Sequence, residues 1–183
     1  MKRNGTMKWM IFTCFGLVIA GCSSDLTPTN AKLEKGLSAY LDGHYECLFP
    51  TGRTFPYEVV PGSDTKADKK QMDAMKAVGL LEEEDDFETH VARYTLTALG
   101  ERVAPRFCYG HKVLVGVDGF TPPVKQDEVV QTTVSYHAKM MDVPVWAKTD
   151  ELEAAFPKMA ADISGSQPGQ IVMATAGVGW SVR

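Results

Sequence analysis

Histidines are the first candidates for chemistry in this sequence, because an imidazole can bind metals and transfer protons near neutral pH. None of them forms the His-x-x-x-His spacing of a helical zinc site, and no Cys-x-x-Cys knuckle accompanies them. His137 falls on the polar face of an expected strand, where solvent would surround it. His111 falls on an apolar face, where a hydrogen-bonded core histidine is a simpler role than a ligand. We expect no metal site and no cofactor at the four histidines, His44, His90, His111 and His137.

Signatures of nucleophilic catalysis and phosphate binding are also missing. The sequence has no Gly-x-Ser-x-Gly elbow, and Gly110, Gly116 and Gly119 do not continue into the Lys-Ser/Thr of a phosphate loop. Asp162 and the acidic run 82–86 supply carboxylates, but no spacing ties two of them to one cleft. We therefore expect a protein that is not an enzyme, unless folding brings histidines or carboxylates together in a pocket.

The first 21 residues have the order of a secretory signal. Basic residues precede an apolar run from Trp9 to Ala20. A run of about 12 residues is roughly 18 Å long as a helix, whereas a membrane span needs about 20 residues. We expect residues 1–21 to be a signal peptide and not a permanent transmembrane helix.

The end of this segment, Ile19-Ala20-Gly21-Cys22, resembles the lipobox of bacterial lipoproteins. The resemblance implies that Cys22 receives a thioether-linked diacylglycerol, that residues 1–21 are removed, and that the new amine is acylated. Two or more acyl chains anchor a protein durably in a membrane. Ser23 stands where the family's inner-membrane retention signal has an aspartate, so the resemblance implies an anchor in the outer membrane, facing the periplasm. The alternative is an ordinary secreted protein with Cys22 near its cleavage site by chance.

Export determines the expected state of the two cysteines in the mature domain, Cys47 and Cys108. Thiols delivered to an oxidising compartment usually pair, so we expect a disulfide between them. The bond would close a loop of about 60 residues, which the chain-entropy model values at about 4 kcal/mol. Two free buried thiols, or a reactive Cys108 beside His111, are the alternatives.

The charge of the chain makes nucleic acid an unsuitable partner. The full sequence has a formal charge of −4, and removal of Lys2, Arg3 and Lys8 with the signal takes the mature part to −7, since −4 − 3 = −7. An acidic domain binds polyanions poorly, because phosphate binding depends on Lys and Arg. We expect no nucleic-acid partner.

The first part of the mature chain is expected to be a tether followed by a helical lobe. Residues 22–30 are rich in Ser, Thr and Pro and predict a lipidated tether. Within a lobe of residues 31–104, apolar spacing predicts a helix over 31–43, capped by Asn30, and a second helix that begins at Ser63 or Asp64 and ends at Gly79. Short strands are expected at 44–49 and 88–97, a long loop at 50–61, and a solvated turn at the acidic run.

The second part, residues 105–183, is expected to be a small antiparallel sheet lobe with one packed helix. Alternation predicts strands over 107–118, with residues 107 to 117 of odd number on one face, and over 130–140. A helix should begin at Thr149 or Asp150 and be kinked or split by Pro157. A final strand is expected over 170–182. The fold class is therefore α+β.

Residues 64–103 resemble a winged-helix domain. The resemblance is carried by Met-Asp-Ala-Met-Lys-Ala-Val-Gly-Leu-Leu from Met72 and by Tyr-Thr-Leu-Thr-Ala-Leu-Gly from Tyr94. It implies a helix, a wing and a Leu-Thr-x-x-Gly tail. DNA binding is not carried over, because five consecutive carboxylates occupy the wing and an export signal precedes it.

The remaining candidate site is a Pro-rich loop, 50–61, with Phe55 and Tyr57. Aromatic residues often anchor interfaces, so these two could bind a partner, although packing around the disulfide is the simpler role. The function predicted from the sequence is a non-enzymatic, membrane-anchored binding or scaffolding accessory of an envelope protein. An inhibitor or immunity-type lipoprotein that protects against an envelope hydrolase or toxin is the alternative.

Overall fold

The computed structural model describes residues 26–60, 62, 65–86 and 90–183. The predicted signal peptide, Cys22 and the caps Ser63 and Asp64 lie outside the described residues. In chain order the elements are α1 (Asn30–Asp42), β1 (Tyr45–Cys47), β2 (Tyr57–Val59), α2 (Lys66–Ala77), β3 (Leu81–Asp86), β4 (Val91–Leu96), α3 (Ala98–Val103), β5 (Cys108–Phe120), β6 (Val124–Gln126), β7 (Val129–Met141), a 3-10 turn (Val145–Ala147), α4 (Asp150–Ala155), α5 (Pro157–Ile163), β8 (Gln167–Thr175) and β9 (Ser181–Val182).

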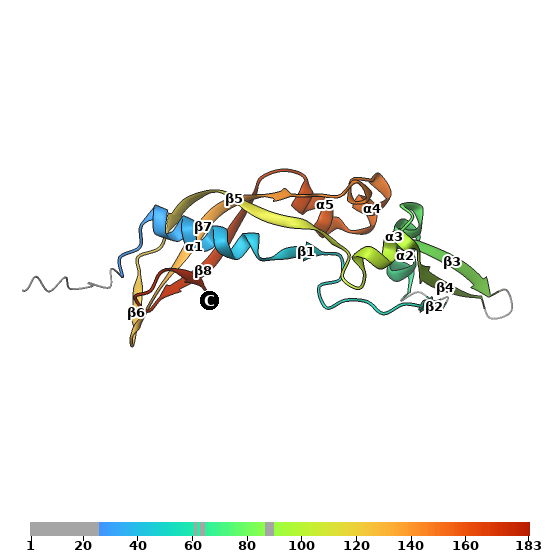
Figure 1. The fold of residues 1–183 in the computed structure, drawn as a ribbon, viewed down its shortest axis with the longest axis horizontal. Coiled ribbons are helices and arrows are strands. Elements are labelled where there is room, and N and C mark those ends of the chain that lie inside the picture. Colours follow the sequence, from blue (N-terminus) through green and yellow to red (C-terminus); the bar gives the residue numbers. More distant parts are fainter. Residues whose placement is uncertain (1–25, 61, 63–64, 87–89) are drawn as a thin grey trace, which may run out of the picture.

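The mixture of helices and antiparallel sheet confirms the coarse fold class. The larger sheet has the order β1-β5-β7-β8-β9, with β6 paired to β7, and all its pairings are antiparallel. A smaller sheet has the order β2-β4-β3. The molecule is elongated: the start of α1 and the β6 hairpin lie at one end and the smaller sheet at the other (Figure 1).

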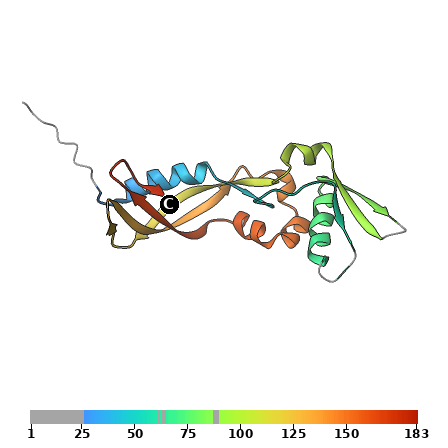
Figure 2. The same ribbon diagram turned by 90° about the horizontal axis from the view of Figure 1, so that it is seen from below.

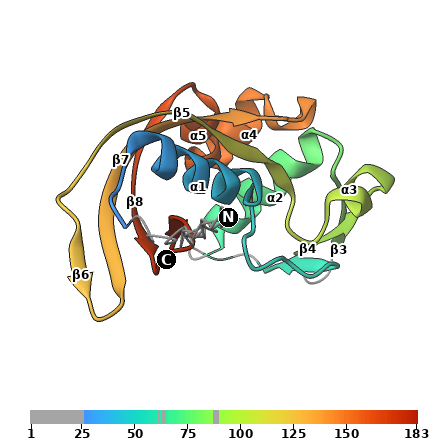
Figure 3. The same ribbon diagram turned by 60° about the vertical axis from the view of Figure 1, so that its left-hand side comes forward.

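The first helix packs inside the curl of the larger sheet, as seen in Figure 3. Leu33, Leu37 and Leu41 of α1 are buried in a core that also contains Val134 and Trp180. The close approach requires Gly36, because a Cβ there would overlap the Trp180 carbonyl oxygen. The expected helix is confirmed, but its cap is Thr29, whose side chain accepts a hydrogen bond from the Lys32 N–H.

Strand β5 departs from the predicted alternation. Register shifts between Leu114 and Gly116, and between Val117 and Gly119, insert extra residues opposite β7. Leu114 and Val117 therefore both pack on the α1 core, whereas Val115 is 57% exposed. The expectation of a single odd-numbered apolar face was wrong because each bulge moves the following side chains to the other face.

Strand β7 follows its predicted alternation. Its even-numbered side chains face the cores: Val130, Thr132, Val134 and Ala138 are buried. The single final strand predicted over 170–182 is two strands, because β8 (Gln167–Thr175) ends before a turn and β9 begins at Ser181. Gly177 and Gly179 lie between them at positive φ.

A second core joins the smaller sheet to helices from both halves of the chain. Met72 and Met75 of α2 pack in one cluster with Leu152 of α4, Met159 of α5 and Phe156 between these two helices. Figure 2 shows α2 beside the pair α4 and α5. Pro157 splits this pair, as predicted, and Thr149 caps α4. The cluster combines residues from both predicted lobes, 31–104 and 105–183. The boundary between these lobes stays a prediction.

The acidic run is a strand and not the solvated turn that was expected. Glu82 to Asp86 pair with β4, and side chains alternate, so that Glu83 faces α2 while Glu82 and Glu84 are exposed. Glu83 is neutralised by Lys69 at 3.2 Å and by Lys76. This alternation could not be predicted from a run of five like charges, because the sequence does not show that Glu83 has two lysine partners. The expected 50–61 loop likewise contains β2, which pairs with β4.

Replacing Glu83 by Gln should therefore destabilise the smaller sheet. Burial alone would raise the pKa of Glu83, but hydrogen bonds from Lys76 and Lys69 outweigh burial and lower it. Loss of this charge should reduce the free energy of unfolding by about 1–2 kcal/mol at pH 7. Glu84→Gln is the matched control, and it should change urea denaturation by less than about 0.5 kcal/mol. Equal effects of the two substitutions would contradict the assignment.

Candidate functional site

The predicted disulfide between Cys47 and Cys108 is present. The two residues are partners in the β1–β5 ladder, with a Cα–Cα distance of 3.7 Å and a sequence separation of 61. Cys47 is buried, and neither sulfur is free to act as a nucleophile or metal ligand. The bond holds the short strand β1 on the edge of the larger sheet.

Four charged side chains form a closed ring beside this disulfide. Lys158 lies 2.7 Å from both Glu46 and Asp162, and Lys112 lies 3.0 Å from both. The buried Tyr109 hydroxyl donates a hydrogen bond to Asp162 at 2.7 Å. Each carboxylate thus has two ammonium partners, and the ring joins β1, β5 and α5.

The ring keeps its members in their ordinary charged forms. Burial alone would raise the pKa of Asp162, but the hydrogen bonds from Lys158, Tyr109 and Lys112 lower it. The pKa of Glu46 is lowered in the same way, by Lys158 and Lys112. Burial tends to lower the pKa of Lys112, but its hydrogen bonds to Asp162 and Glu46 raise it. A general base or nucleophile needs a pKa near the working pH, so this geometry suits a structural brace.

A small hollow adjoins the ring. Its volume is about 220 Å³, below the range of about 300–1,000 Å³ typical of ligand pockets. It is lined by Cys47, Leu48, Gln71, Tyr109, Ala155, Phe156, Pro157, Lys158 and Met159. The sequence did not indicate this ring, apart from the i,i+4 spacing of Lys158 and Asp162 on α5.

The described histidines do not converge on one site. The buried Nδ1 of His111 has no hydrogen-bond partner and lies 3.5 Å from Asp142 Oδ2, so the expected hydrogen-bonded core histidine is not seen at this nitrogen. His137 is half-exposed and lies 2.7 Å from Asp118, consistent with its predicted polar face. His44 contacts the Tyr40 carbonyl. Among the residues that the structure describes, no group of three or more His, Cys, Asp and Glu is placed to hold a metal.

The predicted partner-binding aromatics are partly buried. Phe55 packs on Phe107, with ring centroids 5.7 Å apart, and Tyr57 donates a hydrogen bond to Asp68 Oδ2 at 2.5 Å. Sequence reasoning overlooked Arg53, whose guanidinium lies over the Tyr57 ring. The segment around it, Thr-Gly-Arg-Thr-Phe at residues 51–55, indicated only a turn. The loop therefore presents an arginine together with its aromatics.

No protein-family model, curated protein or solved structure matches the chain. None of the helices that the structure describes is long and apolar enough to cross a membrane.

Replacing Asp162 by Asn should test the charged ring. The variant leaves two lysines with one carboxylate, so the free energy of unfolding at pH 7 should fall by about 1–3 kcal/mol. The pKa of Asp162 is lowered in the folded state, so its contribution is present above its ordinary value of 3.8 and is lost as the pH falls through the lowered pKa. The difference between variant and parent in denaturation experiments should accordingly shrink in acid. Glu151→Gln, at an exposed position on α4, is the control. A difference that persists in acid would contradict the ring's electrostatic role.

Proposed function

We propose that this chain is a lipoprotein of the cell envelope that acts as a non-enzymatic binding or scaffolding accessory for an envelope protein. The observation that carries the proposal is the order of basic, apolar and small residues that ends at Cys22. Cys22 would be the acylated first residue of the mature protein, anchored in the outer membrane and facing the periplasm.

The packing of the first described residues supports a close attachment. Leu26 packs on the α1 core and Pro28 is buried, so the body begins inside the predicted 22–30 tether. Four residue steps separate Cys22 from Leu26, since 26 − 22 = 4, and they span at most about 14 Å. A lipid on Cys22 would hold the α1 end near the bilayer and leave the smaller sheet at the far end (Figure 1).

We interpret α2, the β3–β4 hairpin and α3 as a winged-helix-like unit. The order of helix, hairpin and short helix supports this interpretation, as does the Leu-Thr-x-x-Gly tail. The Thr97 side chain caps α3, and Gly100 lies so close to the Leu80 carbonyl that a Cβ would overlap it. The exposed Glu82 and Glu84 on the hairpin disfavour nucleic acid and leave protein as the suitable partner.

An inhibitor or immunity-type role is the second candidate. Strand β3 is an edge of the smaller sheet and lies at the end of the molecule remote from α1. An edge strand can add to a sheet of a hydrolase or toxin and block it. A deletion strain that becomes sensitive to one particular lysin would favour this role over the accessory role.

Replacing Cys22 by Ser should abolish lipidation. The variant lacks the thiol that would carry the diacylglycerol, so labelled palmitate should no longer enter the protein, and the protein should leave the membrane fraction. Cys14→Ser, in the predicted signal peptide, is the matched control and should keep both properties. Palmitate incorporation in the Cys22→Ser protein would contradict the proposal.

Removing the loop aromatics should release the partner. In envelope extracts of cells that make the lipoprotein, the parent chain should co-purify a stoichiometric envelope protein, whereas the combined change Phe55→Ala and Tyr57→Ala should lose most of it. Tyr45→Ala is the control, because Tyr45 is 57% exposed on β1 and outside the loop. The double variant should also melt at a lower temperature, because both rings contact neighbours in the fold, so binding is compared well below both melting temperatures. Full retention of the partner by the folded double variant would exclude the loop.

A further inference from the structure

The Arg53 side chain is held in position by two aromatic rings. Its guanidinium carbon lies 4.4 Å from the centroid of the Phe49 ring and 4.4 Å from that of the Tyr57 ring. Two aromatic faces attract a cation and restrict its rotation. The backbone beneath it is also held, because the Arg53 N–H donates to the Pro105 carbonyl at 2.9 Å. The side chain is thus positioned before any ligand arrives.

The donors of this guanidinium are not satisfied within the described part of the chain. Nη1 is buried without a hydrogen bond, and its distance to Asp68 Oδ1 is 3.7 Å, too long for one. Asp68 instead accepts a hydrogen bond from the Tyr57 hydroxyl. No hydrogen bond to a described residue involves Nε or Nη2, and neither atom is among the buried, unpaired ones. A guanidinium offers a planar fork of donors that matches a carboxylate.

A hollow of suitable size lies at Arg53. Its volume is about 440 Å³, within the range of about 300–1,000 Å³ common for ligand sites. One part of its wall is apolar and comprises Phe55, Leu96, Ala104 and Pro105, while Thr51 and Thr54 add hydroxyl groups. Gly52 has φ of +83° at the turn that brings Arg53 to this wall. The hollow therefore combines a cation with an apolar surface.

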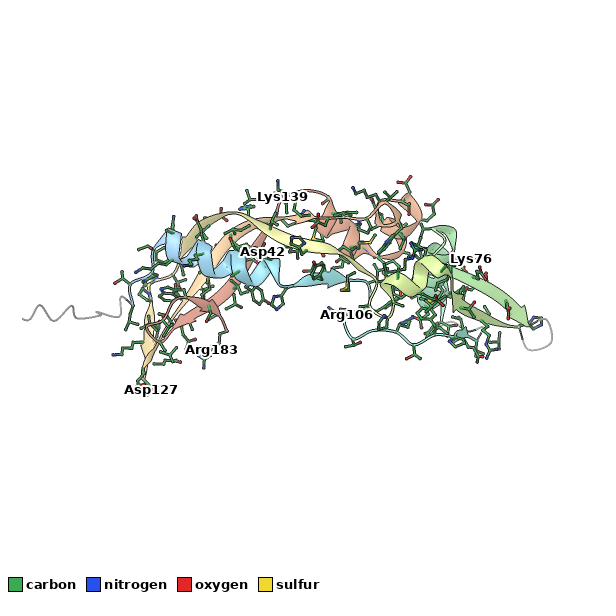
Figure 4. The ribbon with its side chains drawn as sticks, viewed as in Figure 1. Asp42, Lys76, Arg106, Asp127, Lys139 and Arg183 are labelled. Atoms are coloured by element: carbon green, nitrogen blue, oxygen red, sulfur yellow. A yellow bond between two sulfur atoms is a disulfide. The ribbon has the colours of Figure 1, made fainter. Side chains whose placement is uncertain are left out.

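Two further arginines are close in sequence to residues that line the hollow. Arg102 and Arg106 flank the lining residues Ala104 and Pro105, and both are exposed. Figure 4 labels Arg106 at the turn between α3 and β5, beside the start of the 50–61 loop. In the described residues neither Arg102 nor Arg106 has an ion pair, whereas Arg53 lies within ion-pair distance of Asp68, at 3.7 Å. Glu101 is the acid next to Arg102 in sequence, so three arginines stand against two carboxylates here. This charge favours an anionic ligand.

We propose that the Arg53 hollow binds a carboxylate of a partner polypeptide, with the neighbouring apolar side chain of that partner against Phe55 and Leu96. The inference rests on the proposed function only for the origin of the polypeptide, because the site itself is defined by geometry and charge. The carboxylate can be a C-terminus or an acidic side chain, and both have the same chemistry at the guanidinium. Phe55 and Tyr57 then act as the wall of the site and as the support of Arg53.

Peptide titration of the full lipidated chain in detergent tests this site. The probes are N-acetyl-Ala-Leu with a free carboxylate, its C-terminal amide, and N-acetyl-Asp-Leu-amide, and the readout is the NMR signal of the Arg53 Nε–H. Saturable shifts with the first probe alone identify a C-terminus as the ligand, and shifts with the third identify an acidic side chain. The uncharged amide should not bind. Binding of the uncharged amide as well as the acids, absence of any shift, or equal binding of inorganic phosphate would overturn the proposal.

Matched arginine variants separate recognition from folding. Arg53→Gln should weaken binding at least tenfold, measured by calorimetry, whereas Arg93→Gln should not change it, because Arg93 pairs with Glu58 on the smaller sheet. The combined change Arg102→Gln and Arg106→Gln alters exposed side chains only and should weaken binding about threefold, which keeps the test valid if Arg53→Gln misfolds. Unchanged affinity in a folded Arg53→Gln protein, or in the double variant, would refute the site. The Cys22→Ser chain should bind the probes normally, so failure of lipidation and failure of this site are distinguishable.

Discussion

The antiparallel pairing of β5 with β7 extends from His111 opposite Met141 to Phe120 opposite Val134, and both hydrophobic cores are built on it. Tyr109, at the start of β5, lies in the core shared with α2, α4 and α5, whereas Val134 of β7 lies in the core around α1. Thirteen residues in a strand span about 43 Å. The two cores are therefore held apart along one pair of long strands, which explains why the molecule is elongated (Figure 1).

Local patterns in the sequence predicted the elements that depend on local physics. The apolar spacing of Leu33, Leu37 and Leu41 identified α1, the alternation after Val129 identified β7, and Pro157 marked the break between α4 and α5. The errors came from partners distant in sequence. The bulges of β5 depend on its register with β7, and Glu83 of β3 has its charge partners, Lys69 and Lys76, on α2. Neither feature has a signature within its own segment.

The candidate sites likewise include features that the sequence predicted and features that depend on partners distant in sequence. The Cys47–Cys108 bond followed from the number of cysteines and the predicted compartment. The charged ring could not be predicted, because Glu46, Lys112 and Lys158 come from three elements and only Lys158 and Asp162 are neighbours on one helix. Arg53 was overlooked for a related reason: the ring of Phe49 is four residues before it and that of Tyr57 four after it, yet a turn at Gly52 is required to bring both onto the guanidinium.

The contact between Gly36 and Trp180 also constrains the order in which the protein can fold during its synthesis. These residues are 144 positions apart, since 180 − 36 = 144, and the α1 core is closed by Trp180. The leucines of α1 are synthesised early, but this part of their burial site does not exist until residue 180 has been made. Contacts of such long sequence separation form slowly, because loop-closure entropy must be overcome first. Until then the exposed leucine stripe is a surface for a chaperone or for aggregation.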